Sequence, residues 1–289
     1  MVKPFYHTRC PALCPVSFTL STTAGRDIIA NESINFYSVV MPHRFCPLLV
    51  VGLLLVAVPA LANGLPDTDG DGVPDQDEIN IYQTSVDQAD TDGDGYSDRQ
   101  ELLAGYSPHN PKNIKLIDND QDQDGLSDFW ELRFSTNLLM ADTDGDNIND
   151  GDEIDQATDP RQVGAVKLPI RLDVSLKRQE LTYWLAGVKF KQFPVSSGAP
   201  RTPTPIGQYR VINKLPKAWS PYGLWMPYWL GLGRGRFGFH ELPIWPNGYR
   251  EGANHLGKAV SHGCIRLGIG PAQYLYDRVD VGTVVNINR

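Results

Sequence analysis

The sequence predicts a mainly β fold with one late helix, preceded by an array of acidic loops with short helices. Three observations support this prediction. An aspartate-rich pattern recurs between residues 67 and 153, apolar and polar residues alternate in several segments after residue 168, and residues 271–279 carry a helical pattern with a proline near its first turn. The predicted strands are 168–176, 180–185, 188–195, 207–212 and 282–287.

The distribution of charge divides the chain. The net charge of −8 hides 26 acidic against 4 basic residues in 63–160, a balance of −22, and 6 acidic against 18 basic residues in 161–289, a balance of +12. The acidic part suits cations, and the basic part suits an anionic substrate or polymer. We therefore expect an upstream extension at 1–62, an acidic repeat region at 63–164 and a C-terminal domain at 165–289. No nucleic-acid partner is expected.

Residues 41–62 have the features of a secretory signal. Met41-Pro42-His43-Arg44 is a short basic region, residues 45–59 form an apolar run, and Ala60-Leu61-Ala62 is a small-residue cleavage site. The apolar run is shorter than the ~20 residues that a transmembrane helix needs. We expect translation from Met41, cleavage after Ala62, export to the periplasm or cell envelope, and no transmembrane segment in the mature chain.

Such cleavage would leave a single thiol. The chain has four cysteines, and Cys10, Cys14 and Cys46 all precede the cleavage site. An exported chain with Cys264 alone cannot form an internal disulfide. An unpaired thiol in an oxidising compartment is a candidate nucleophile.

A loop pattern typical of calcium sites occurs four times between residues 67 and 153. Oxygen-bearing side chains occupy loop positions 1, 3, 5, 9 and 12, a glycine occupies position 6, and position 7 offers a backbone carbonyl. In the fourth copy Asn147 replaces the glycine, and asparagine tolerates left-handed geometry. The predicted Ca²⁺ ligands are Asp67, Asp69, Asp71, Val73, Asp75 and Glu78; Asp90, Asp92, Asp94, Tyr96, Asp98 and Glu101; Asp120, Asp122, Asp124, Leu126, Asp128 and Glu131; and Asp142, Asp144, Asp146, Ile148, Asp150 and Glu153.

The spacing of these loops argues against EF-hands, because only 11 residues lie between Glu78 and Asp90 and only 10 between Glu131 and Asp142. Apolar residues beside each final glutamate argue against a disordered acidic linker. The segment resembles bacterial thrombospondin type 3 repeats, with dockerin-like loops as a more distant alternative. The resemblance implies structural calcium in a string of loops, and no cofactor is expected in catalysis.

Residues 219–230 are rich in aromatic residues and proline, so no regular strand is predicted there. The segment is expected to form either a lid or groove wall beside Cys264 or an extra piece of core.

The run Ser261-His262-Gly263-Cys264-Ile265-Arg266-Leu267 carries the candidate nucleophile. If this run is a β-strand, residues two apart share one face, so His262, Cys264 and Arg266 point the same way. A cysteine nucleophile needs a base, and the base needs an orienting group. His262 and His240 are both candidate bases, and the residues alone leave the choice open.

Residues 168–289 resemble the YkuD-type L,D-transpeptidase catalytic domain. The matching segments are 193–198, 204–207, His240, 256–267 and 275–285. The resemblance implies a β-sandwich whose cysteine attacks a peptidoglycan stem peptide, forms a thioester and releases the terminal D-alanine. An amine of a neighbouring stem then takes the acyl group.

The resemblance also implies roles for individual residues. His240 would be the base for Cys264, oriented by the main-chain carbonyl of Glu241. Backbone N–H groups of Gly263 and Cys264 would stabilise the oxyanion. The remaining site residues, which would shape the site and bind substrate, are Ser261, His262 and Arg266.

The chain departs from the family pattern in the loop 241–255, where Glu241-Leu242 follows His240 in place of Gly-Thr, so the acceptor stays open. One alternative is a hydrolase with the same thioester chemistry, either an L,D-carboxypeptidase or an amidase that releases a wall-linked lipoprotein. Another is a non-catalytic, calcium-dependent wall-binding protein. The leading interpretation implies a role in cell wall organisation and cell shape. The catalytic segment is expected to have a core separate from the calcium array.

Overall fold

The computed structural model describes residues 65–233 and 237–289. The predicted start at Met41, the signal sequence and the first three cysteines lie outside the described residues. Within the described ranges, no helix is long and apolar enough to cross a membrane.

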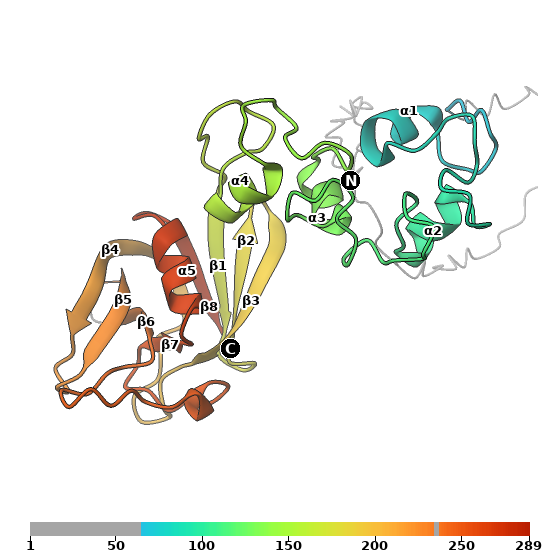
Figure 1. Cartoon of the computed structure of the whole chain (residues 1–289). Coiled ribbons are helices and arrows are strands. Elements are labelled where there is room, and N and C mark those ends of the chain that lie inside the picture. The colour runs from blue at the N-terminus through green and yellow to red at the C-terminus, as the bar shows by residue number, and fades with distance from the viewer. Residues whose placement is uncertain (1–64, 234–236) are drawn as a thin grey trace, which may run out of the picture. The chain divides into compact units, whose positions relative to one another are not determined.

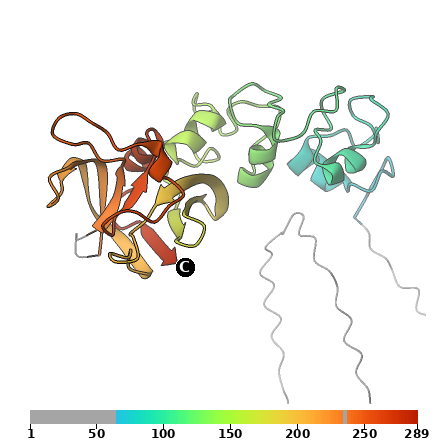
Figure 2. The ribbon, with the colours of Figure 1, turned by 90° about the horizontal axis from the view of Figure 1, so that it is seen from below.

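The acidic region folds as loops that each lead into a short helix. The second, third and fourth loops are followed by α2 (Asp98–Ala104), α3 (Asp128–Phe134) and α4 (Asp150–Gln156), and the first by α1 (Asp75–Asp77) and a π-helical turn, Glu78–Tyr82. These loop-and-helix units follow one another along the chain (Figure 2). Each of the helices α2, α3 and α4 has seven residues. It begins at loop position 9 and ends where the next residue takes a left-handed backbone conformation. The prediction of short helices is confirmed.

The C-terminal region is a ring of strands. In chain order the strands are β1 (Ile170–Ser175), β2 (Glu180–Leu185), β3 (Val188–Ser196), β4 (Gly207–Trp219), β5 (Trp225–Leu232), β6 (Phe237–Glu241), β7 (Ile265–Leu267) and β8 (Val284–Asn288). Their spatial order is β1-β2-β3-β7-β6-β5-β4-β8, closed by the parallel pairing of β1 with β8. Strands β3 and β4 each pair in both sheets, so the two layers join.

One helix follows Cys264. Helix α5 (Pro271–Arg278) starts with its proline, where the missing N–H costs no intrahelical bond. It contacts β5, β6 and β7, and Figure 1 shows it beside the strands. The predicted mainly β fold with one late helix is confirmed.

The strand β5 corrects the prediction for residues 219–230. Pro227 has no N–H to donate, but it pairs with Lys217 where only β4 and β5 lie side by side, so the strand tolerates it. Tyr228 takes a left-handed φ of 54°, which bends the strand. Residues 261–267, which carry the candidate nucleophile, do not form a strand over their whole length. Gly263 has a φ of 112°, and β7 begins only after Cys264.

The core is not separate from the calcium array, contrary to expectation. One cluster of buried apolar residues contains Leu126, Phe134 and Ile154 of the array together with residues of the β-ring. Trp130 also packs edge-on against Phe190 of β3, with ring centroids 5.0 Å apart. The physical reason is the shortness of the helices in the array, because a seven-residue helix cannot bury its own apolar side chains. Those of α3 and α4 are covered by the ring.

Candidate active site and calcium loops

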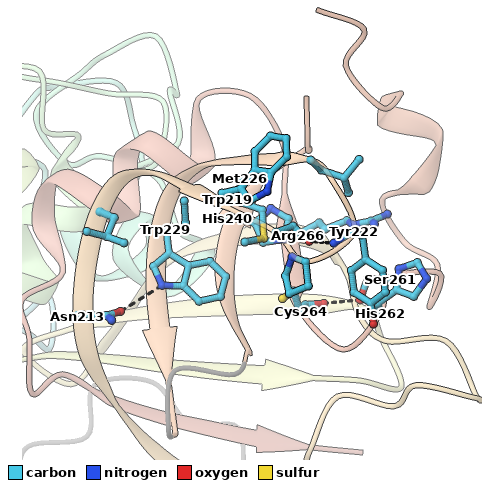
Figure 3. A pocket seen from close by; sticks show the side chains of 15 residues that line it. Asn213, Trp219, Tyr222, Met226, Trp229, His240, Ser261, His262, Cys264 and Arg266 are labelled. Atoms are coloured by element: carbon cyan, nitrogen blue, oxygen red, sulfur yellow. Dashed lines mark hydrogen bonds between the residues drawn. The ribbon is translucent and has the colours of Figure 1, made fainter. Parts of the chain in front are cut away.

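A pocket of about 590 Å³ opens between the β4–β5 hairpin and the ends of β6 and β7. Figure 3 shows its lining. The candidate residues His240, Ser261, His262, Cys264 and Arg266 all line it. The hairpin contributes the opposite wall, with Trp219, Tyr222, Met226 and Trp229 among its members. The aromatic segment therefore forms a wall of this pocket.

The pairing of β6 with β7 brings the reactive groups together. The two strands are parallel, and His240 lies in register with Arg266. Because Cys264 precedes Arg266 by two positions, it is the diagonal neighbour of His240 across this pair. On the other side of β6, Gly238 lets the strand lie close to β5, since a Cβ there would lie 2.2 Å from the carbonyl oxygen of Leu230.

His240 is held as a neutral imidazole. Its Nδ1 lies 2.6 Å from the carbonyl oxygen of Glu241. A carbonyl only accepts hydrogen bonds, so Nδ1 carries the proton and Nε2 keeps a free lone pair. Burial, together with the positive charge of Arg266, lowers the pKa of His240 to about 3. The ring of Trp229 stacks over it at 6.1 Å and helps to exclude water.

Burial raises the pKa of the Cys264 thiol, while a backbone hydrogen bond from Gly238 and the charge of Arg266 oppose that rise. The resting pair is therefore a neutral thiol beside a neutral imidazole. Proton transfer between them has to accompany attack on the substrate.

The turn before Cys264 is fixed by hydrogen bonds. Ser261 Oγ donates to the carbonyl of Cys264 at 2.6 Å and accepts from the N–H of Gly263 at 3.1 Å. Thr204 Oγ1 donates to the carbonyl of Gly263 at 2.9 Å. Gly263 can bind an oxyanion only if Ser261 gives up this contact, so the expected oxyanion role of Gly263 stays a prediction.

The two candidate bases have different surroundings. His240 is 2% exposed, whereas His262 lies at the surface and stacks on Tyr222 with ring centroids 4.1 Å apart. Among the described residues, no main-chain carbonyl is hydrogen-bonded to the ring of His262. The orienting group that a base requires is therefore found at His240.

Glu251 was not among the predicted site residues, and Glu241 was predicted without its ion pair. Glu251 pairs with Arg266, and the Glu241 side chain pairs with Arg250. A signal was present: residues 161–289 contain only 6 acids, and these two lie within the 23 positions between His240 and Cys264.

Each calcium loop gathers carboxylates around one point. Ligand atoms of Asp67, Asp69 and Asp71 lie within 4.8 Å of one another, and the same holds for the corresponding aspartates of the other three loops. Buried carboxylate oxygens without a hydrogen-bond partner occur at loop positions 3 and 12 in all four loops; they belong to Asp69, Glu78, Asp92, Glu101, Asp122, Glu131, Asp144 and Glu153. Oxygen donors of this charge and number fit Ca²⁺.

The electrostatics of the loops agree with a cation at their centres. Burial and the neighbouring aspartates raise the pKa of Glu101 to about 8 and that of Glu131 to about 9. Carboxylates this crowded remain ionised at neutral pH only when a positive charge balances them.

Two other loop positions have additional contacts. At position 9, both carboxylate oxygens of Asp98 accept hydrogen bonds from Thr91, and Asp75 and Asp150 have the same contacts with Thr68 and Thr143. Their coordination of Ca²⁺ stays a prediction. At position 5, Asp124 accepts from the N–H of Gly151 at 2.7 Å and so joins the third loop to α4.

Two protein-family profiles match the chain. The L,D-transpeptidase catalytic domain (YkuD) matches residues 169–287, and the bacterial TSP3 repeat matches residues 67–84 and 90–105. The putative L,D-transpeptidase YkuD of Bacillus subtilis (strain 168) is 34% identical over 122 residues, which is 42% of this chain and 68% of that protein. The protein of the same name from Bacillus licheniformis is 32% identical over 120 residues, 42% of this chain and 66% of that protein.

Solved structures with a similar β domain include an L,D-transpeptidase from Mycobacterium smegmatis, with 24% identity and a TM-score of 0.37, covering 44% of this chain and 65% of that one. An L,D-transpeptidase from Mycobacterium tuberculosis H37Rv has 25% identity and a TM-score of 0.37, covering 43% and 59%. This chain thus spans less than two thirds of the length of these solved chains.

Proposed function

Because the chain belongs to the YkuD family of L,D-transpeptidases, we propose that it is an exported cysteine-dependent acyltransferase that acts on peptidoglycan stem peptides. The observation that carries this proposal is the orientation of His240. The Nδ1 of His240 donates a hydrogen bond to the Glu241 carbonyl, and His240 lines the same pocket as Cys264.

In the first half-reaction, the Cys264 proton passes to His240 Nε2 as Sγ attacks the carbonyl carbon of the third stem residue. The tetrahedral intermediate collapses when the bond to the terminal D-alanine nitrogen breaks. That nitrogen takes the proton from His240, and a thioester remains. Burial that holds His240 neutral favours return of the proton to the leaving group.

In the second half-reaction, an amine of a neighbouring stem or of a wall-linked lipoprotein attacks the thioester carbonyl. His240 takes the proton of this amine and passes it to Sγ as the carbon–sulfur bond breaks, so Cys264 leaves as the thiol. The pocket wall at Trp219 and Tyr222 would decide whether an amine or water reaches the thioester, because both residues line the same pocket as Cys264.

The TSP3 repeats are of a calcium-binding type, and their clustered aspartates give them the matching donor set. We infer a structural role for Ca²⁺ there, holding the array in shape and placing the enzyme at the wall.

The test is muropeptide analysis with purified, calcium-loaded protein and two substrates, stem tetrapeptides and peptidoglycan that carries a wall-linked lipoprotein. New cross-links between third residues of two stems support transfer to an amine. Tripeptide products alone would support a carboxypeptidase, and release of a wall-linked lipoprotein would support an amidase. Unchanged muropeptides would leave the wall-binding alternative. An L,D-transpeptidase named LdtMt1 has been solved in complex with imipenem, so imipenem is a second probe, read as an intact-mass increase at Cys264.

A further inference from the structure

Arg266 is held from outside its strand by a carboxylate of the loop between β6 and β7. Its Nη1 lies 2.6 Å from Oε2 of Glu251, and only 6% of the Arg266 side chain and 13% of the Glu251 side chain are exposed. Two charges this buried stay together only when their geometry is good and their other polar atoms are satisfied.

The loop fixes Glu251 from several sides. Its N–H donates to the carbonyl of Pro243 at 3.0 Å, and its Oε2 lies 3.2 Å from Nδ1 of His255. The preceding residue, Arg250, pairs with Glu241, the residue that follows the candidate base. The position of Glu251 is therefore tied to β6.

Arg266 has a donor that the described residues do not use. Its Nε is buried and has no hydrogen-bond partner there, although the residue lines the pocket. A guanidinium carries five N–H groups in a fixed plane, so a carboxylate that holds Nη1 also sets the direction of Nε–H.

We infer that Glu251 is a positioning residue: by holding Nη1 of Arg266 it keeps the free Nε–H of Arg266 available to an oxygen of the acyl substrate, and it balances the guanidinium charge beside Cys264. The substrate part of this inference rests on the proposed function. The charge part depends only on the geometry.

The charge part follows from the groups around the thiol. The titratable and charged groups come from four elements. They are His240 and Glu241 on β6; Arg250, Glu251 and His255 in the loop; Tyr222 in the hairpin; and His262 and Arg266 beside Cys264. Arg266 lowers the pKa of Cys264, and the opposite charge of Glu251, 2.6 Å from Nη1 of Arg266, should weaken that effect. Removing the charge of Glu251 should therefore lower the pKa of the thiol.

The first measurement is the rate of Cys264 alkylation by iodoacetamide against pH, followed by peptide mass spectrometry in the whole calcium-loaded chain. Glu251→Gln keeps the shape of the side chain and is expected to shift the inflection to lower pH. Glu251→Asp keeps the charge and should leave the inflection near that of the wild type. The matched control is Glu180→Gln, which removes a glutamate paired with Arg178 outside the pocket lining and should change nothing.

The second measurement is KM for a disaccharide tetrapeptide. Both Glu251 variants are expected to raise KM about tenfold, as when a charge-assisted hydrogen bond is lost, with a smaller change in kcat. An unchanged inflection in folded Glu251→Gln, or an unchanged KM in Glu251→Asp, overturns the inference. If Glu251→Gln does not fold, the KM of Glu251→Asp decides alone. Wild-type protein that turns over no substrate refutes the proposed function, and the alkylation profile still tests the charge part.

Discussion

Arg278 of α5 contacts Asp155 of α4: its Nη2 lies 2.5 Å from Oδ2 of Asp155, and its Nε donates to the carbonyl of the same residue. Asp155 follows Glu153, the last predicted ligand of the fourth calcium loop, by two positions. Helix α5 packs against β6 and β7, the strands that place His240 and Arg266. The fourth loop is thus linked to the active site through two helices.

Calcium removal is expected to reach the β-ring as well as the array. Without the cation the crowded carboxylates repel one another, and α4, with Ile154 in the shared core, loses its support. EDTA should increase proteolysis within 65–160, and a loss of about 1 kcal/mol should lower the melting temperature of the ring by roughly 2–4 °C. Limited proteolysis and calorimetry with and without Ca²⁺ measure these effects. A ring that melts at the same temperature in EDTA would show that the contact contributes no stability.

Truncating the shared core from the array side tests the same contact without a chelator. Ile154 is 1% exposed, so Ile154→Ala should cost about 2–5 kcal/mol in the free energy of unfolding. Ile79 in the first repeat is 62% exposed, and Ile79→Ala is the matched control with a change near zero. Denaturant unfolding in saturating Ca²⁺ compares the two. Equal losses in both variants would contradict the shared core.

Loss of the nucleophile should abolish acylation. Cys264→Ala is expected to show no mass increase with imipenem and no change in muropeptides. His240→Gln should slow acylation by about 10²–10⁴-fold, the range of a general base. His262→Gln should cost less because that ring lies at the surface on Tyr222. Intact-mass kinetics rank the variants, and a larger loss at His262 would reverse the assignment of the base.

The acid side of the pH profile separates the two histidines. Because the pKa of His240 is lowered to about 3, the base stays neutral and the acylation rate should stay level below pH 6. A histidine with an ordinary pKa would instead give a fall near ~6.5. Rapid acylation with imipenem after a pH jump records this profile. A rate that halves near pH 6.5 would count against His240.

The same shift has a consequence for stability. The folded-state pKa of His240 lies below its unfolded value, so the unfolded chain binds the extra proton first as pH falls. The contribution of His240 to the free energy of unfolding is therefore full above ~6.5 and is lost as pH falls toward about 3. Wild type should thus lose more stability than His240→Gln over this interval. Comparing the two at constant Ca²⁺ cancels the titration of the array.

The sequence by itself determined the local features. Period-two alternation specified β1 to β3, because strands with one buried face require it, and Pro271 specified the start of α5. The loop spacing specified where the aspartates converge, since six ligand positions within twelve residues leave the backbone little choice. Cys264 stood out as the candidate nucleophile because the other three cysteines precede the predicted cleavage site.

Tertiary structure decided what depends on partners far along the chain. Strand β5 forms despite Pro227 because β4 supplies its hydrogen bonds, and the three-residue β7 exists only between β3 and β6. The carbonyl that orients His240 belongs to its sequence neighbour Glu241, as the family resemblance implied, but the burial of His240 depends on strands far along the chain. Arg266 meets Glu251 for the same reason: a loop of 22 residues between β6 and Cys264 has many paths, and packing selects the one that pairs these charges.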